Sequence, residues 1–171
     1  MDIKAVLNGN SQCDIEMQVV SKSDIEKRIM FYWSKMYTQT IKQGDGYDTL
    51  NKTISVLIAD FELENLKGIE KYITKWNIRE EEYKSVILTD VLEIYIIELP
   101  KFLRYVKNKT TKNLNLWVEF IRNPEVVFMN EQNEDKTIEE TKKAIEKAKK
   151  NLEEISNDEH ERYLAHLREK H

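Results

Sequence analysis

The chain has 171 residues, of which 34% are charged and 40% hydrophobic, with a formal net charge of −4 at pH 7. This length can bury the core of one domain, and the charge balance excludes the global basic excess that marks many nucleic-acid-binding proteins. A single cysteine, Cys13, excludes an intramolecular disulfide, and the absence of a signal peptide and of a long apolar run predicts a cytoplasmic protein with no membrane partner.

Two short strands joined by a turn are predicted at the start of the chain. Residues 13–19 alternate apolar and polar side chains, the period-two pattern of a half-buried strand, with Cys13 as a small buried hydrophobe. Residues 1–7 form the partner strand, and the segment Asn8-Gly9-Asn10-Ser11 favours a short hairpin loop. The alternation places three polar side chains on one face: Asp14, Glu16 and Gln18.

The position of the hairpin loop decides which acids share a face, because a slip of one residue moves every side chain of a strand to the other side. A two-residue loop, Gly9-Asn10, would place Asp2 opposite Met17. A three-residue loop at positions 9–11 places Asp2 opposite Gln18 and brings the carboxylates of both strands to one face. We predict this second register.

The acids Asp2 and Glu16 are the candidate metal ligands of this hairpin. Two carboxylates on adjacent strands can hold a hard divalent cation such as Mg²⁺. Such a cation can activate a water molecule and neutralise charge on a phosphodiester oxygen. The alternative is that both carboxylates are simply solvated, as acidic residues on an exposed strand face usually are.

A helix and three strands are predicted next. A capping box begins at Ser23, and apolar residues recur at helical spacing until Gly44, so we expect a helix that packs on the sheet. Residues 54–61 are nearly continuously apolar, which predicts a central strand covered on both faces. Residues 72–79 and 91–99 are predicted to pair as a further hairpin.

Several segments in this order resemble the PD-(D/E)XK nuclease family transposases, also called recombination-promoting nucleases. In these proteins a core strand reads Ile-Glu-x-Gln where most of the superfamily has Glu-x-Lys, and residues 15–18 read Ile-Glu-Met-Gln. The resemblance covers roughly residues 1–122 and, more loosely, the helical tail, and it implies an α/β fold, with a restriction-endonuclease-like mixed sheet flanked by helices. The other segments that carry it are residues 24–37, 54–61 and 88–102.

The resemblance implies an endonuclease that hydrolyses DNA phosphodiester bonds with Mg²⁺ or Mn²⁺ and acts in DNA recombination or on a mobile element. On this pattern Asp2 and Glu16 are metal ligands, and Gln18 completes the catalytic set. Gln18 stands where most relatives have lysine, so it can orient the attacking water by hydrogen bonds but brings no positive charge. Arg28 and Gln39 match polar positions of the pattern and are expected to support the site, although Gln39 is equally well explained as a helix-surface amide.

Family members carry a helix and a strand before the first acid, whereas here Met1 directly precedes Asp2. We therefore expect the first helix and strand of the core to be missing. This leaves a second hypothesis, in which the chain is a catalytically inactive short form. Such a form would be a DNA-binding or protein-interaction module that pairs with a second copy of itself or with a full-length relative.

Residues 101–122 carry six basic residues and one acid, with aromatic residues between them. Such a stretch can contact a phosphate backbone, where positive charge gains from counterion release. The alternative is a segment whose aromatic residues lie in the core and whose lysines are solvated. The candidate DNA contacts are Lys101, Arg104, Lys107, Lys109 and Lys112.

The chain is predicted to divide into a nuclease-like core at residues 1–122, a polar linker at 123–136 and an amphipathic helical tail at 137–171. The apolar stripe of the tail begins at Ile138 and is short, which favours docking on the domain over a coiled coil, with self-association as the alternative. All three histidines lie in the tail, and their spacing does not indicate a metal site.

Overall fold

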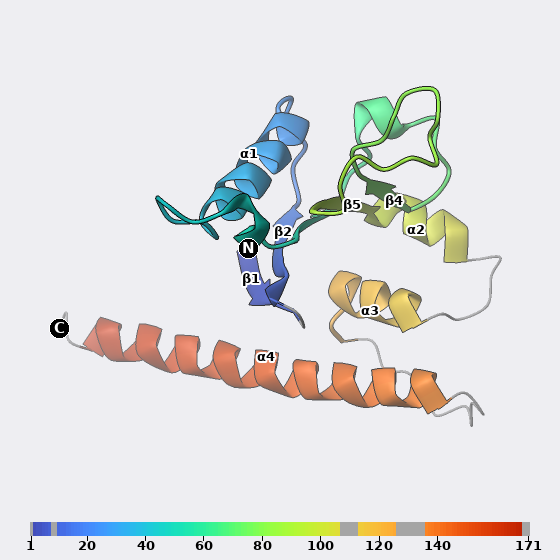
Figure 1. Ribbon diagram of the computed structural model, residues 1–171. Helices are drawn as coiled ribbons and strands as arrows, with labels where there is room; N and C mark the ends of the chain where they lie inside the picture. Colours follow the sequence, from blue (N-terminus) through green and yellow to red (C-terminus); the bar gives the residue numbers. More distant parts are fainter. Residues whose placement is uncertain (1, 8–9, 107–112, 126–135, 169–171) are drawn as a thin grey trace. The chain divides into compact units, whose positions relative to one another are not determined.

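A computed structural model of the chain (Figure 1) describes residues 2–7, 10–106, 113–125 and 136–168. It divides the chain into two compact units, Met1–Asn108 and Lys109–His171. The first unit contains a five-stranded sheet with helices α1 and α2, and the second contains α3 and α4. In the described part of the chain, no helix combines the length and the apolar character needed to cross a membrane.

The sheet of the first unit is mixed, with the strand order β1-β2-β3-β5-β4. β1 is antiparallel to β2, β3 is parallel to both β2 and β5, and β4 is antiparallel to β5. The central place of β3 and the pairing of β4 with β5 confirm two predictions from the sequence. The strands are β1 (Asp2–Val6), β2 (Gln12–Gln18), β3 (Thr53–Ala59), β4 (Ile73–Trp76) and β5 (Leu92–Glu98).

The loop of the β1–β2 hairpin lies one residue earlier than predicted. The backbone N–H of Leu7 donates to the carbonyl oxygen of Ser11 at 2.7 Å, so Leu7 and Ser11 flank the loop, where the sequence predicts Asn8 and Gln12. Asn10 has a φ of 63°, in the left-handed region that asparagine tolerates better than most residues. The turn-prone composition therefore predicts the hairpin and its loop length but not the position of the loop.

The earlier loop moves the register of β1 by two residues. Asp2 is paired with Glu16, and Lys4 with Asp14, so the predicted pairing of Asp2 with Gln18 is wrong. Because side chains alternate with a period of two, a shift by two changes the partner of each residue but not the face to which it belongs.

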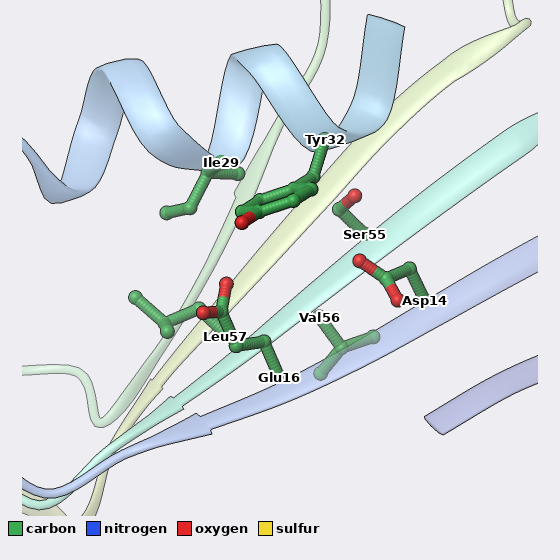
Figure 2. Close-up of a pocket in the computed structure, with 7 residues that line it drawn as sticks. All are labelled: Asp14, Glu16, Ile29, Tyr32, Ser55, Val56 and Leu57. Carbon is green, nitrogen blue, oxygen red and sulfur yellow. The ribbon is translucent and has the colours of Figure 1, made fainter. Parts of the chain in front are cut away.

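Helix α1 (Ile25–Thr38) crosses one face of the sheet above β2 and β3 (Figure 2). Its four buried residues recur at helical spacing, which makes one apolar stripe, and the indole Nε1 of Trp33 donates to the carbonyl oxygen of Thr53 at 3.0 Å. The helix begins after Asp24, which makes no side-chain cap, so the predicted capping box at Ser23 is wrong. The buried residues are Ile25, Ile29, Trp33 and Met36.

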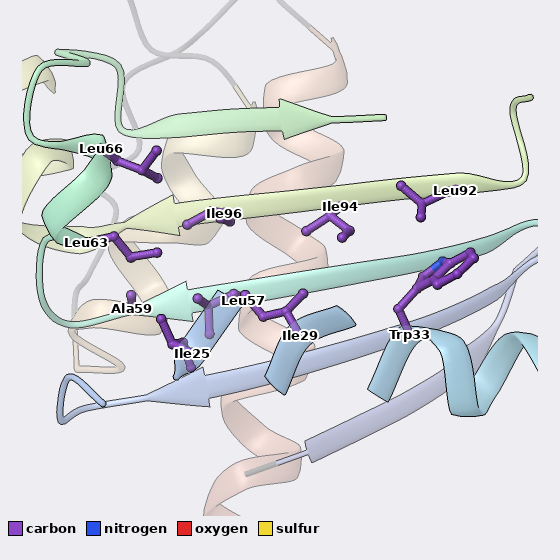
Figure 3. Close-up of a cluster of buried hydrophobic side chains, with 10 residues drawn as sticks. All are labelled: Ile25, Ile29, Trp33, Leu57, Ala59, Leu63, Leu66, Leu92, Ile94 and Ile96. Carbon is purple, nitrogen blue, oxygen red and sulfur yellow. The ribbon is translucent and has the colours of Figure 1, made fainter. Parts of the chain in front are cut away.

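The hydrophobic core of the first unit lies between α1 and the sheet (Figure 3). β3 and β5 contribute their α1-facing side chains, and the segment after β3, which includes the short 3₁₀ helix η3 (Glu64–Leu66), closes the core at one end. The face of β2 that carries the acids therefore lies against a helix. The core residues are Ile25, Ile29, Trp33, Leu57, Ala59, Leu63, Leu66, Leu92, Ile94 and Ile96.

A buried ion pair stands where β5 passes into α2 (Leu99–Val106). The ammonium of Lys101 lies 2.6 Å from Glu98 Oε2 and donates to the carbonyl oxygen of Leu66 at 2.6 Å. The other carboxylate oxygen, Glu98 Oε1, accepts the backbone N–H of Leu63 at 2.9 Å. The pair thereby ties the segment around η3 to the end of β5.

The second unit is a pair of helices, α3 (Asn113–Arg122) and α4 (Lys136–Arg168), packed through Leu116, Phe120, Ile138 and Ile145. This grouping differs from the sequence-based boundary, which places residues 113–122 in the nuclease-like core. Most of the predicted linker, residues 126–135, lies outside the described residues.

Candidate active site

The polar face of β2 is buried beneath α1. Asp14 is 8% exposed and Glu16 is 6% exposed, although both are acids on a strand that the sequence predicts to be half-buried. The buried face follows from α1, whose stripe covers β3 and reaches over β2 (Figure 2). Solvation, the alternative considered for these carboxylates, does not apply to Glu16.

The carboxylate of Glu16 is held by two side chains, both through Oε1. The amide Nε2 of Gln18, on the same strand, donates to it at 2.5 Å. The guanidinium of Arg28, on α1, donates through Nε at 3.0 Å and lies 2.8 Å away through its second nitrogen. Arg28 also stands over the ring of Tyr32, 5.3 Å from its centroid. The structure thus brings Glu16, Gln18 and Arg28 into direct contact.

A helical stripe from α1 borders these acids. Arg28, Tyr32 and Lys35 follow one another at positions i, i+4 and i+7, so they lie on the same side of the helix. With β1 and β2, Tyr32 and Lys35 of this stripe line an open hollow. The lining residues are Lys4, Asp14, Glu16, Tyr32, Lys35 and Met36.

A second, smaller hollow shares Asp14, Glu16 and Tyr32 with the first and extends to Ser55 on β3 (Figure 2). Ser55 is paired in register with Asp14 and is 5% exposed. Its hydroxyl makes no hydrogen bond within the part of the chain that the structure describes. A small polar residue at this position leaves room beneath the Tyr32 ring, which a larger side chain would fill.

Asp2 is placed by its backbone alone, because its side chain lies outside the described part of the structure. The register puts it directly opposite Glu16. Directly opposed residues of antiparallel strands belong to the same side of a sheet. Among the side chains that are described, no three acids, histidines or cysteines come together as metal ligands. A cation site therefore requires Asp2 beside Glu16 and Asp14, an all-oxygen set of the kind that hard cations prefer.

Gln39 is not brought to this site. It is the exposed C-cap residue of α1, where its backbone N–H bonds to the last turn of the helix, and it lines neither hollow. This observation agrees with the surface-amide alternative for Gln39.

The five predicted DNA contacts in the basic stretch differ in their exposure to solvent and in whether the structure describes them. Lys101 is 1% exposed and bonded to Glu98, so its ammonium cannot reach a phosphate, and that prediction is wrong. Arg104 is exposed and paired with Glu62 at 2.7 Å. Lys107, Lys109 and Lys112 lie outside the described residues.

The sequence-based site omits five residues that the structure places there. For Asp14 a signal was available, since strand alternation puts it on the face of Glu16. For Tyr32 and Lys35 the signal was their helical spacing from Arg28. For Lys4 the hairpin register was needed, and for Ser55 the sequence carries no signal, because its position depends on the parallel pairing of β2 with β3.

A family model described as PD-(D/E)XK nuclease family transposase matches residues 1–171. The chain belongs to this family. No curated protein and no solved structure matches the chain. The mixed five-stranded sheet with its helices is consistent with the restriction-endonuclease-like fold of PD-(D/E)XK nucleases. The segment Ile15-Glu16-Met17-Gln18 lies on β2, with Glu16 buried.

Proposed function

We propose that this PD-(D/E)XK protein is a divalent-metal-dependent endonuclease that hydrolyses phosphodiester bonds of DNA and acts in recombination or on a mobile element. The observation that supports the proposal most strongly is the register that pairs Asp2 with Glu16 on adjacent strands. The proposal includes a cytoplasmic location, as expected from the sequence.

The ligands for the cation would be the carboxylates of Asp2 and Glu16, the two metal ligands of the family pattern, with Asp14 as a third acid beside them. Bound there, Mg²⁺ or Mn²⁺ would lower the pKa of a water molecule and offset negative charge on the phosphodiester. The nearby hollow gives a phosphate group access to these acids.

In most of the superfamily one lysine both orients the attacking water and supplies positive charge, and here Gln18 and Arg28 would each provide one of these functions. The amide of Gln18 can orient a water molecule, since it has a donor and an acceptor, but it is neutral. Arg28 brings a permanent positive charge to the same carboxylate from α1. Together they supply the hydrogen bonds and the charge at Glu16.

The test is cleavage of a supercoiled plasmid with Mg²⁺, comparing the wild-type chain with Glu16→Gln. Removing a carboxylate ligand should lower the cleavage rate on the order of 100-fold or more, because charge stabilisation by the cation is lost. A chelator should have the same effect on the wild type.

The matched control is Glu64→Gln, which removes an exposed acid of η3 that pairs with Lys67. Its cleavage rate should equal that of the wild type. Cleavage that persists in Glu16→Gln, or in the presence of a chelator, would contradict the proposal.

One observation favours the second hypothesis, a non-catalytic module. Arg28 already neutralises Glu16, so this buried carboxylate has a cationic partner without any metal. A wild-type chain that binds DNA but leaves the plasmid intact with both Mg²⁺ and Mn²⁺ would support this module.

A further inference from the structure

We propose that Lys4 and Lys35 bind the phosphate backbone of DNA at the rim of the hollow that contains Asp14 and Glu16. This inference rests on the proposed function for its substrate, double-stranded DNA. It assigns the backbone contacts to residues outside the basic stretch at 101–122.

The two lysines come from different elements and meet at one opening. Lys4 is on β1, paired in register with Asp14, and Lys35 is on the last turns of α1. Both are exposed and both line the hollow that contains Asp14 and Glu16. The two lysines therefore border the hollow from two different elements.

Neither Lys4 nor Lys35 forms an ion pair within the described part of the chain. Four other lysines of the first unit differ in this respect. Lys52 and Lys75 pair with Glu93, Lys67 pairs with Glu64, and Lys101 is buried against Glu98. Lys4 and Lys35 thus retain their charge for a ligand.

The negative charge of Asp14 and Glu16 favours cationic side chains along the path of an approaching phosphate. A phosphodiester that approaches Asp14 and Glu16 meets two buried carboxylates, and repulsion must be offset along its path. Lysine is suited to this task, since it is a compact point charge on a flexible stem that can follow a phosphate. The lysines flank the hollow, whereas Arg28 is already engaged with Glu16.

The experiment measures the binding of a fluorescently labelled DNA duplex by anisotropy, in the presence of a chelator so that no cleavage occurs. The wild type is compared with the double variant Lys4→Gln, Lys35→Gln across a series of salt concentrations. Each lost phosphate contact should lower the slope of log affinity against log salt by about 0.9, so the double variant should lose about 1.8. Both substitutions are at exposed positions, and circular dichroism should confirm an unchanged fold.

The matched control is Lys27→Gln, Lys71→Gln, which changes the net charge equally at two exposed lysines that do not line the hollow. The control should keep the wild-type slope. An equal loss of slope in both variants, no loss in either, or a wild type that does not bind the duplex would each overturn the proposal.

The failure of this inference and that of the proposed function are distinguishable. A wild-type chain that binds DNA through Lys4 and Lys35 but does not cleave it with Mg²⁺ would contradict only the endonuclease. Metal-dependent cleavage with an unaltered salt slope in the double variant would contradict only the lysine contacts.

Discussion

At the scale of single residues, Glu16 is the group on which the site depends. It is a buried acid, and a buried carboxylate is costly unless it is paired and hydrogen-bonded. Arg28 and Gln18 meet this requirement through Oε1. On the proposed function, a cation bound at Glu16 would compete with the guanidinium of Arg28, since both positive charges would act on one carboxylate.

Replacing Arg28 by Gln tests this competition. The change removes the cation beside Glu16, so the free energy of unfolding should fall by about 1–3 kcal/mol without metal. Added Mg²⁺ should raise the melting temperature of Arg28→Gln more than that of the wild type, because it no longer competes with the guanidinium. Thermal unfolding followed by circular dichroism, with and without Mg²⁺, measures both effects.

Lys27→Gln, at the neighbouring exposed position of α1, serves as the control and should behave as the wild type. A larger stabilisation by Mg²⁺ in the wild type than in Arg28→Gln would contradict competition between the two cations.

The residues of the site were predictable to different degrees. Strand alternation correctly groups Asp14, Glu16 and Gln18, because it depends only on the local backbone. The partner of Asp2 was not predictable, since a loop displaced by one residue changes the pairing by two. The burial of Lys101 depends on Glu98 and on the carbonyl of Leu66, and composition carries no information about that distant contact.

At the scale of elements, the junction of β5 and α2 is fixed by the buried pair of Glu98 and Lys101. Both side chains have further backbone partners, Leu63 and Leu66, in the segment around η3. Removing one partner of a buried pair leaves the other charge uncompensated, whereas removing both charges does not. The pair therefore should show strong coupling between substitutions.

Lys101→Met should lower the free energy of unfolding by roughly 3–5 kcal/mol, because Glu98 then remains charged and buried. The double variant Glu98→Gln, Lys101→Met should lose less, since a neutral amide can still accept the N–H of Leu63. Urea denaturation of the single and double variants measures the difference. A double variant that is as unstable as Lys101→Met, or more so, would contradict this account.

The elements themselves were largely predictable where packing follows a local pattern. The continuous apolar run gives the central strand β3, and the β-branched run of β5 pairs with β4 as expected. The sequence does not determine whether α3 packs on the nuclease-like core or on α4, because its apolar residues are compatible with both. Its contacts with Ile138 and Ile145 of α4 decide that it belongs to the second unit.

At the scale of the whole molecule, we expect an ionic cluster around Glu93 of β5 to contribute to stability in acid. Glu93 receives hydrogen bonds from Lys52, which precedes β3, from Lys75 on β4 and from Tyr95 on β5. Burial raises the pKa of Glu93, but these three hydrogen bonds outweigh it and lower the pKa from its ordinary value of 4.5 to about 2. The cluster therefore links β4, β5 and the residue that precedes β3 through one ionised carboxylate.

Because the pKa of Glu93 is lowered by folding, its stabilisation is fully present above pH 4.5 and is lost as the pH falls toward 2. Between these limits the wild type should lose about 1–2 kcal/mol more unfolding free energy than Glu93→Gln, after allowance for solvent screening. Urea denaturation at a series of pH values compares the two proteins. Equal losses in both would contradict the role of this carboxylate.

Almost everything that lines the hollow comes from one continuous stretch, the strand β2 followed by α1, joined by residues 19–24. The length of that connection determines which side of α1 faces β2. Each residue added to or removed from it would turn α1 by about 100° unless the loop absorbed the change. An insertion or deletion there would move Arg28, Tyr32 and Lys35 away from Asp14 and Glu16 together. We therefore expect the activity of this protein to survive single substitutions in residues 19–24 more readily than a change in the length of this connection.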